Sequence, residues 1–304
     1  IAMYRAKAAG KARYAVFDRS LHAEVSNRLR LEADLRHAIA QGQLAVVYQP
    51  LVELEGNRLV GFEALARWNH PEQGPIGPDV FIPVAEESGL IVGLTDLVLK
   101  RACDQLRQWQ LIDESFADLR IQVNLSGRDV AQAGLTGRIS QALLGAGLQA
   151  QHLTLELTEN ILMERLETAL PMLEELRGLG VRLSVDDFGT GYSSLAHLST
   201  LPIDSLKVDR SFVRNLSAGS KEAMVVRGIV QLGQSLGKDV VAEGIETASQ
   251  FDQLRGMGCR LGQGFLMARP MSAERITALL VGQQPWTGGV ALPVALNPLA
   301  TQLH

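Results

Sequence analysis

The chain has 304 residues, of which 46% are hydrophobic and 20% are charged, and its formal net charge is −4. This length fits one large α/β domain or two small ones, and the composition is that of an ordinary globular protein. The acidic balance argues against binding to nucleic-acid polymers. Residues 1–40 hold eight Lys or Arg against four Asp or Glu, so the rest of the chain carries −8. A protein this acidic needs metal cations between itself and a phosphate ester.

The cysteines and the apolar runs bear on location. Cys103 and Cys259 are the two cysteines, and they form no CxxC motif, which favours a reduced, cytoplasmic compartment and argues against a cysteine metal site. No apolar run approaches the ~20 residues that cross a membrane, and no signal-peptide pattern is visible. The chain begins with Ile1, so we expect a fragment of a longer protein, whose upstream regions can carry a membrane attachment.

The first 41 residues predict two segments. Residues 1–18 have the pattern of a helix end, a turn at Gly10 and a short strand, which is too little for a domain. Residues 19–41 place leucines and other aliphatic residues at helical spacing among alternating charges. We therefore expect an amphipathic helix that links this remnant to the larger domain beyond it.

Short β-rich runs then alternate with helical patterns. The runs cover residues 44–50, 59–68, 119–126, 153–159, 182–188, 205–209, 239–243 and 259–265. The helical patterns cover residues 94–110, 131–144, 164–179, 221–236 and 248–257. The first two runs meet through a turn at 54–57, as in an antiparallel hairpin. Eight strands, most of them followed by helices, predict an α/β fold, a (β/α)8 barrel with an irregular first strand. An open doubly wound sheet is the alternative, but its usual glycine-rich phosphate loop is not present. We expect the barrel at 42–283 and a tail at 284–304.

Polar residues recur near the carboxyl ends of the predicted strands. Side chains alternate between the two faces of a strand, so the apolar set of each strand packs on the outer helices and the polar set points into the barrel. The predicted interior set is Glu63, Asn124, Glu156, Asp186, Lys207, Glu243 and Gln263. Catalytic residues of such barrels lie at this end, and the same alternation leaves Asp187 at the rim.

Each of these residues has an ordinary structural interpretation when taken alone. The Asp186–Asp187 pair can form a turn after a strand, Lys207 can extend from a strand end, and Asn124 can satisfy a turn. Together they are costly to bury without a cation. Oxygen ligands without a histidine or cysteine cluster indicate Mg²⁺ or Mn²⁺ rather than zinc. Two adjacent aspartates suit a pair of metal ions about 3.5–4 Å apart, a geometry of phosphoryl displacement.

Several motifs occur together in one order along residues 28–283. They are YQP at 48–50, EALARW at 63–68, VNLS at 123–126, ELTE at 156–159, DDFGTGYSSL at 186–195, LKVD at 206–209, AEGIE at 242–246 and QGF at 263–265. This combination resembles the EAL family of cyclic di-GMP phosphodiesterase domains. The resemblance implies a modified TIM barrel with an antiparallel first strand, and hydrolysis of cyclic di-GMP to linear 5′-pGpG with Mg²⁺ or Mn²⁺.

The resemblance also implies roles for individual residues. The implied metal ligands are Glu63, Asn124, Glu156, Asp186 and Asp187, with Glu243 acting through water. Lys207 would position the attacking water. Whether Asp187, Glu243 or the metals alone deprotonate this water stays open. The implied nucleotide contacts are Gln49, Leu65 and Arg67, while Gln263 lines the metal-water site and Glu159 anchors the loop after Asp187. Two metal ions, inhibition by Ca²⁺ and a homodimer are further implications.

The N-terminal segment and two other functions complete the expectations. Residues 1–18 resemble the end of a GGDEF diguanylate cyclase domain, but no GGDEF signature occurs in the chain, so we expect no cyclase activity. A cyclic di-GMP receptor without turnover is the alternative function. Proton abstraction beside a carboxylate, as in enolase-type barrels, is a third hypothesis, which the adjacent aspartates and the interior Asn124 fit less well.

Overall fold

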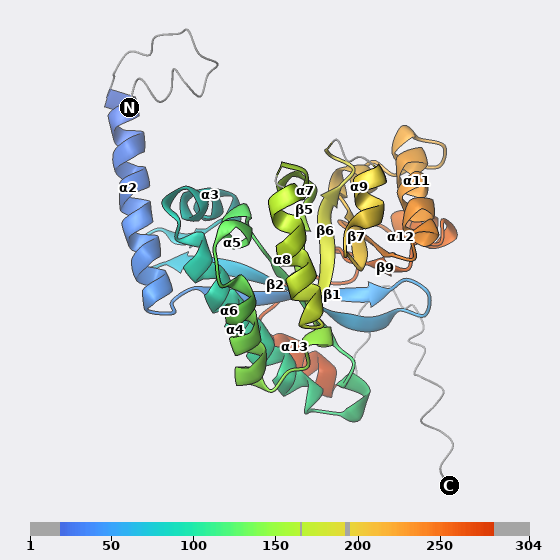
Figure 1. The fold of residues 1–304 in the computed structure, drawn as a ribbon, viewed down its shortest axis with the longest axis horizontal. Coiled ribbons are helices and arrows are strands. Elements are labelled where there is room, and N and C mark those ends of the chain that lie inside the picture. Colours follow the sequence, from blue (N-terminus) through green and yellow to red (C-terminus); the bar gives the residue numbers. More distant parts are fainter. Residues whose placement is uncertain (1–18, 165, 192–194, 283–304) are drawn as a thin grey trace. The chain divides into compact units, whose positions relative to one another are not determined.

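The computed structural model describes residues 19–164, 166–191 and 195–282 (Figure 1). The predicted remnant at 1–18 and the predicted tail at 284–304 lie outside these residues. The chain divides into two compact units. Residues 19–45 and 67–94 belong to the unit that we call the helical unit. Residues 46–66 and 95–282 belong to the barrel unit, which carries the predicted site.

The barrel unit is built on a closed sheet. Its strands are β1 (Ala45–Glu53), β2 (Arg58–His70), β4 (Arg120–Asn124), β5 (Leu153–Thr158), β6 (Arg182–Phe188), β7 (Ser205–Val208), β8 (Asp239–Ala242) and β9 (Leu261–Gly262). They follow the order β1-β9-β8-β7-β6-β5-β4-β2, and pairing of β1 with β2 closes the ring. β1 is antiparallel to β9, whereas the neighbours from β2 round to β9 are parallel. This confirms the predicted barrel with an antiparallel first strand.

Helices follow most of the parallel strands. They are α4 (Ile91–Gln110), α5 (Gly127–Ala131), α6 (Leu135–Ala146), α7 (Glu159–Glu164), α8 (Leu166–Gly178), α9 (Leu195–Thr200), α10 (Arg210–Arg214), α11 (Lys221–Ser235), α12 (Ala248–Gly256) and α13 (Ala273–Val281). Side-chain caps fix several starts: the Ser220 hydroxyl accepts a hydrogen bond from the Ala223 amide at α11, and Thr247 with Gln250 forms a capping box at α12. None of the described helices is long and apolar enough to cross a membrane.

Strand alternation produces the core of the barrel unit. The apolar set of each strand is buried, as Leu155, Leu183 and Leu206 show by having no exposed surface. Trp109 of α4 is also fully buried and packs its ring against Phe62 of β2, with ring centroids 4.5 Å apart. Burial of this apolar set leaves the polar set of the same strands for the barrel interior.

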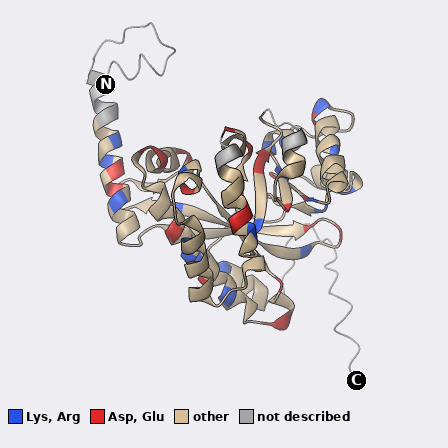
Figure 2. Ribbon diagram, in the orientation of Figure 1, with Lys and Arg blue, Asp and Glu red and all other residues tan. Residues whose placement is uncertain are grey.

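The helical unit contains α2 (Arg19–Ala40), α3 (Pro78–Ser88) and β3 (Gly74–Ile76), which pairs antiparallel with the end of β2. Basic and acidic residues both occur along the coloured part of α2 (Figure 2), and the predicted helix agrees with α2. The His70 ring anchors this unit, because its Nε2 lies 3.2 Å from Asp34 Oδ2 of α2 while its Nδ1 accepts hydrogen bonds from the Glu72 and Gln73 amides.

The structure differs from the predictions in several places, and the short helices α7, α9 and α10 are among the elements that were not predicted. The strand β3 and the helices α3 and α13 were not predicted; β3 has only three residues and α3 contains Pro83, so neither gives a regular pattern. The helix predicted at 131–144 is instead two helices, α5 and α6. Gly134 adopts a φ of 86° immediately before α6, a left-handed conformation that interrupts the helix.

Replacement of Gly61 tests the close pairing of β2 with β4. A Cβ at this position would lie 2.2 Å from the backbone oxygen of Arg120, so Gly61→Ala should lower the free energy of unfolding by about 1–3 kcal/mol. The matched control is Gly228→Ala in the middle of α11, where a Cβ meets no atom within 4 Å. It should stabilise the protein by about 0.5–1 kcal/mol. Urea unfolding of both variants measures this, and equal stabilities would contradict the register.

Candidate active site

The predicted interior residues converge at one end of the barrel unit. All but Glu63, which lies in the middle of the long strand β2, lie in the last part of their strands or just beyond them. Parallel strands bring these ends to one mouth. The positions are Glu63 in β2, Asn124 in β4, Glu156 in β5, Asp186 and Asp187 in β6, Lys207 in β7, Glu243 after β8 and Gln263 after β9. We call this group the acidic cluster.

Lys207 stands at the centre of the acidic cluster and is fully buried. Its Nζ lies 2.7 Å from Glu243 Oε1 and 2.8 Å from Glu156 Oε2. Asp186 Oδ1 and Glu63 Oε2 follow at 3.4 and 3.5 Å. Burial alone would lower the pKa of Lys207, but these four carboxylates raise it well above its ordinary value. The side chain is therefore a permanent ammonium ion.

Two amides hold Glu63 in place. The Asn124 side-chain amide donates to Glu63 Oε1 at 2.8 Å, and Gln263 Nε2 donates to Glu63 Oε2 at 2.7 Å and to Glu243 Oε1 at 3.1 Å. Burial raises the pKa of Glu63, yet Lys207 and the two amide hydrogen bonds outweigh it, and the net pKa is lowered. Glu63 is thus an ionised carboxylate with a fixed orientation.

Three acids of the cluster, Glu156, Asp187 and Glu243, have raised pKa values. Burial is the main cause in each case. It raises the pKa of Glu156 well above the ordinary value, although Lys207 opposes the shift. Burial and repulsion from Asp186 raise the pKa of Glu243 to about 8 and that of Asp187 to about 6. One ammonium ion is therefore too little positive charge for this group of carboxylates.

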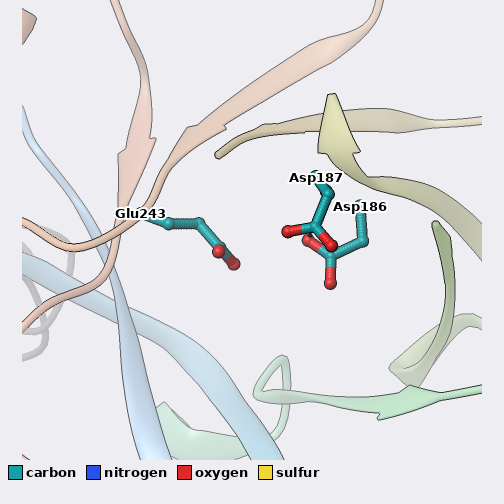
Figure 3. A group of neighbouring side chains, drawn as sticks. All are labelled: Asp186, Asp187 and Glu243. Carbon is teal, nitrogen blue, oxygen red and sulfur yellow. Dashed lines mark hydrogen bonds between the residues drawn. The ribbon is translucent and has the colours of Figure 1, made fainter. Parts of the chain in front are cut away.

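A β-bulge brings the two adjacent aspartates to the same site. β6 and β7 pair Val185 with Leu206 and Phe188 with Val208, so β6 carries one extra residue between these pairs. Asp187 adopts a φ of 54° there, a left-handed conformation that costs strain in a residue other than glycine. Strict alternation would turn Asp187 away from Asp186. Instead, Asp186, Asp187 and Glu243 offer carboxylate oxygens within 4.8 Å of one another, and their side chains point toward one another (Figure 3).

The residues of the cluster fit divalent cations. Glu156 Oε1 and Gln263 Oε1 are buried, and no described residue donates a hydrogen bond to either. Five carboxylates with one ammonium ion leave four negative charges when all are ionised, which equals the charge of two divalent cations. Because every donor atom is an oxygen, the set suits Mg²⁺ or Mn²⁺.

Asp209 was not assigned to the site from the sequence. It follows β7 and contributes, by its charge and a hydrogen bond, to the raised pKa of Asp187. Its own Oδ1 accepts a hydrogen bond from the Ser211 amide at the start of α10. The alternation in LKVD, which places Asp209 on the same face as Lys207, is the signal that could have identified it.

Glu159 fixes the loop that follows the aspartates. Its Oε2 accepts hydrogen bonds from the Gly189 amide at 2.8 Å and the Gly191 amide at 3.3 Å. Gly189 has a φ of 100°, and a Cβ on Gly191 would come within 2.7 Å of Glu159 Oε1. Residues 192–194 of the loop lie outside the described part of the chain.

The residues expected to contact a nucleotide lie on the first two strands. Gln49 of β1 is nearly buried and its Nε2 donates to the Ala268 carbonyl oxygen at 3.3 Å. Leu65 is half-buried on β2, two residues beyond Glu63. Arg67 is half-buried further along β2, in the helical unit.

Metal binding should depend on pH in a definite direction. Below their raised pKa values, Asp187 (about 6) and Glu243 (about 8) are protonated, and a cation must displace these protons. Mn²⁺ should therefore raise the melting temperature more at about pH 8.5 than at about pH 5.5.

Thermal unfolding with and without Mn²⁺ measures this. Asp186→Asn should lose most of the increase, whereas Asp252→Asn, on the exposed face of α12, should keep it. An equal increase at both pH values would contradict the involvement of Asp187 and Glu243.

Comparison with known proteins places the chain in a family. A family model described as the EAL domain matches residues 32–270. The chain is 45% identical over 277 residues to the bifunctional diguanylate cyclase/cyclic di-GMP phosphodiesterase MucR of Pseudomonas aeruginosa, and the match covers 91% of the chain and 40% of MucR. It is 44% identical over 280 residues to the cyclic di-GMP phosphodiesterase NbdA of the same organism, with coverage of 92% and 36%. The chain thus spans about two fifths of the length of these relatives.

Solved structures agree with the sequence comparison. A PaMucR phosphodiesterase in complex with c-di-GMP superimposes with a TM-score of 0.77 at 46% identity, covering 81% of this chain and 99% of that one. An EAL domain protein from Listeria monocytogenes gives a TM-score of 0.69 at 30% identity, with coverage of 81% and 96%. By the matched family model, the identities and the barrel that carries the acidic cluster, this chain belongs to the EAL domain family.

Proposed function

We propose that this chain is a metal-dependent phosphodiesterase that hydrolyses cyclic di-GMP to linear 5′-pGpG. The observation that carries the proposal is the acidic cluster, in which one buried ammonium ion lies within 3.5 Å of four carboxylates and Glu156 keeps a buried oxygen without a described hydrogen-bond donor. The names of the relatives MucR and NbdA support the substrate. The complete set of candidate metal ligands favours an enzyme over a receptor that only binds the nucleotide.

The proposed reaction adds one water molecule across one phosphodiester bond. The water oxygen bonds to phosphorus, the bond from phosphorus to the 3′ oxygen breaks, and the 3′ oxygen takes up a proton. The product keeps the phosphate on its 5′ end. When bound, divalent cations supply positive charge against the phosphate oxygens and lower the pKa of water.

The residues divide the work between binding and proton transfer. Glu63, Asn124, Glu156, Asp186 and Asp187 would hold the cations. Hydrogen bonds from the Asn124 and Gln263 amides hold the Glu63 oxygens in place before substrate arrives.

Lys207 and its neighbours would act on the water and the developing charge. The ammonium of Lys207 lies among the carboxylates, where it can orient water and oppose negative charge on the phosphate in the transition state. The raised pKa of Asp187 or Glu243 suits a group that accepts the proton of the attacking water. Gln263 keeps Glu243 oriented through its amide.

The remaining proposals concern substrate, metal and organisation. Gln49, Leu65 and Arg67 would contact the nucleotide, and Glu159 would couple the loop to the site. Mg²⁺ or Mn²⁺ would support turnover, whereas the longer and looser coordination of Ca²⁺ would inhibit it. We propose a cytoplasmic homodimer in which residues 42–283 form the catalytic domain and residues 19–41 link it to a GGDEF remnant at 1–18.

Loss of a ligand should abolish turnover. Glu63→Gln and Asp186→Asn should each reduce kcat by at least about 100-fold and weaken Mn²⁺ binding, because each removes a charged donor from the cluster. Asp252→Asn, on the surface of α12, should leave both unchanged. Chromatography of cyclic di-GMP and pGpG after incubation with Mg²⁺ or Mn²⁺ measures this. Binding of cyclic di-GMP without any pGpG under both metals would refute the enzyme and support a receptor.

Lys207 should act on kcat more than on nucleotide binding. Lys207→Ala should lower kcat by at least about 100-fold at saturating Mn²⁺ while changing KM little, because the ammonium acts mainly in the transition state. The control is Lys100→Ala on the exposed face of α4. A raised KM with an unchanged kcat would contradict this role.

A further inference from the structure

The opposite mouth of the barrel carries a second polar site. A cavity of about 430 Å³ lies there, and arginines from four segments of the barrel unit line it. Arg58, Arg120 and Arg182 are the first residues of β2, β4 and β6, and Arg260 immediately precedes β9. Because parallel strands all begin at this end, the topology gathers these arginines into a partial ring. We call them the arginine ring.

The arginine ring is separate from the acidic cluster. Arg182 and Asp186 lie on the same strand, four residues apart, which corresponds to ~13 Å of extended chain. One mouth of the barrel is thus lined by carboxylates and the other by guanidinium groups. A ligand attracted to the arginine ring need not be the substrate of the acidic cluster.

Two carboxylates neutralise only part of the arginine ring. Glu53 pairs with Arg58 at 3.1 Å and with Arg260 at 3.3 Å. Asp239 pairs with Arg260 at 2.6 Å and with Arg182 at 3.5 Å. Three guanidinium groups therefore share two carboxylates.

Arg120 is the least compensated member of the ring. It is half-buried, and no carboxylate among the described residues lies within ion-pair distance of it. Burial and the charges of Arg182 and Arg260 lower its pKa, with Asp239 and Asp118 partly opposing them. Arg120 thus has only indirect compensation from Asp239 and Asp118 and makes no ion pair with a described residue, and an anion in the cavity would form one with it.

His152 is a buried polar side chain in the wall of the cavity. It lines the same cavity, it is nine-tenths buried, and no described residue makes a hydrogen bond to its Nδ1. Gln151 lines the cavity beside it. The Nδ1 of His152 has almost no accessible surface, so an oxyanion in the cavity would find its donors on Arg120 and the other guanidinium groups.

The lining indicates the chemical class of the ligand. Guanidinium groups match the geometry of phosphate oxygens. None of the described residues that line the cavity is Phe, Tyr or Trp, so a nucleobase finds no ring of these types to stack on. Asp118 also lines the cavity and reduces its positive charge, which favours a compact, multiply charged anion. We propose that the arginine ring binds a phosphate group, either as free phosphate or pyrophosphate or as the phosphate end of a nucleotide.

Direct binding measurements with the whole chain test this proposal. Calorimetric titration with pyrophosphate, in EDTA and at constant ionic strength, should show binding to the wild-type protein. Arg120→Gln should weaken it by about tenfold or more, because it removes a charge-assisted hydrogen bond. Arg255→Gln, an exposed arginine of α12 that pairs with Asp252, is the matched control and should bind as the wild type does.

The folded state of Arg120→Gln can be checked independently. Since no described carboxylate pairs with Arg120, its melting temperature without anion should equal or exceed that of the wild type. Titrations with 5′-GMP and pGpG identify the source: tighter, Arg120-dependent binding of a nucleotide supports a nucleotide ligand, and equal affinities support free phosphate. Absence of pyrophosphate binding, or binding that Arg120→Gln leaves unchanged, would overturn the proposal.

Discussion

The buried ammonium of Lys207 is the interaction on which this protein depends. It lies within 3.5 Å of four carboxylates from four different strands or strand ends, and no ordinary core would gather so many acids. Two unit charges 4 Å apart interact by about 4 kcal/mol at an effective dielectric constant near 20. Lys207 therefore offsets part of the repulsion among the acids, while burial first, and repulsion from the neighbouring acids second, still raise the pKa values of Glu156 and Glu243.

The barrel makes this arrangement possible because one set of side chains on each strand packs in the core while the other set forms the polar interior. The apolar set of each strand is buried outside the sheet, as with Leu155 and Leu183, and supplies stability that offsets the cost of the polar interior. The strand ends then hold the carboxylate and amide oxygens of the site in fixed positions. At the bulge in β6, Asp187 adopts a strained left-handed conformation, and two consecutive aspartates thereby face one site. The same separation leaves the other mouth available for the arginine ring.

Much of this could be predicted because strand alternation is a strict geometric rule. It placed Glu63, Glu156, Asp186 and Lys207 in one interior set, and the parallel order then brought them together. The shared orientation of Asp187 was not accessible from alternation, since a bulge depends on the pairing of β6 with β7 rather than on local sequence. The break at Gly134 and the short strand β3 were not predicted for a related reason: neither produces a hydrophobic pattern long enough to recognise in the sequence.

The arginine ring could not be predicted from the sequence either. Arg120 and Arg182 are separated by more than sixty positions in the numbering, and an arginine at a strand start is ordinary when seen alone. Closure of the sheet brings these arginines together. Only the closed sheet shows that members of the ring share the carboxylates of Glu53 and Asp239. Charge balance across a closed barrel is thus a property of the topology.

The number of bound metal ions tests the central claim most directly. If the uncompensated charge of the acidic cluster is balanced by divalent cations, native mass spectrometry in Mn²⁺ should find two ions per chain. Asp187→Asn should reduce this number to one, because it removes the charge of the second aspartate that the bulge brings into the site. A wild-type protein that hydrolyses cyclic di-GMP while binding no metal ion at saturating Mn²⁺ would contradict the account.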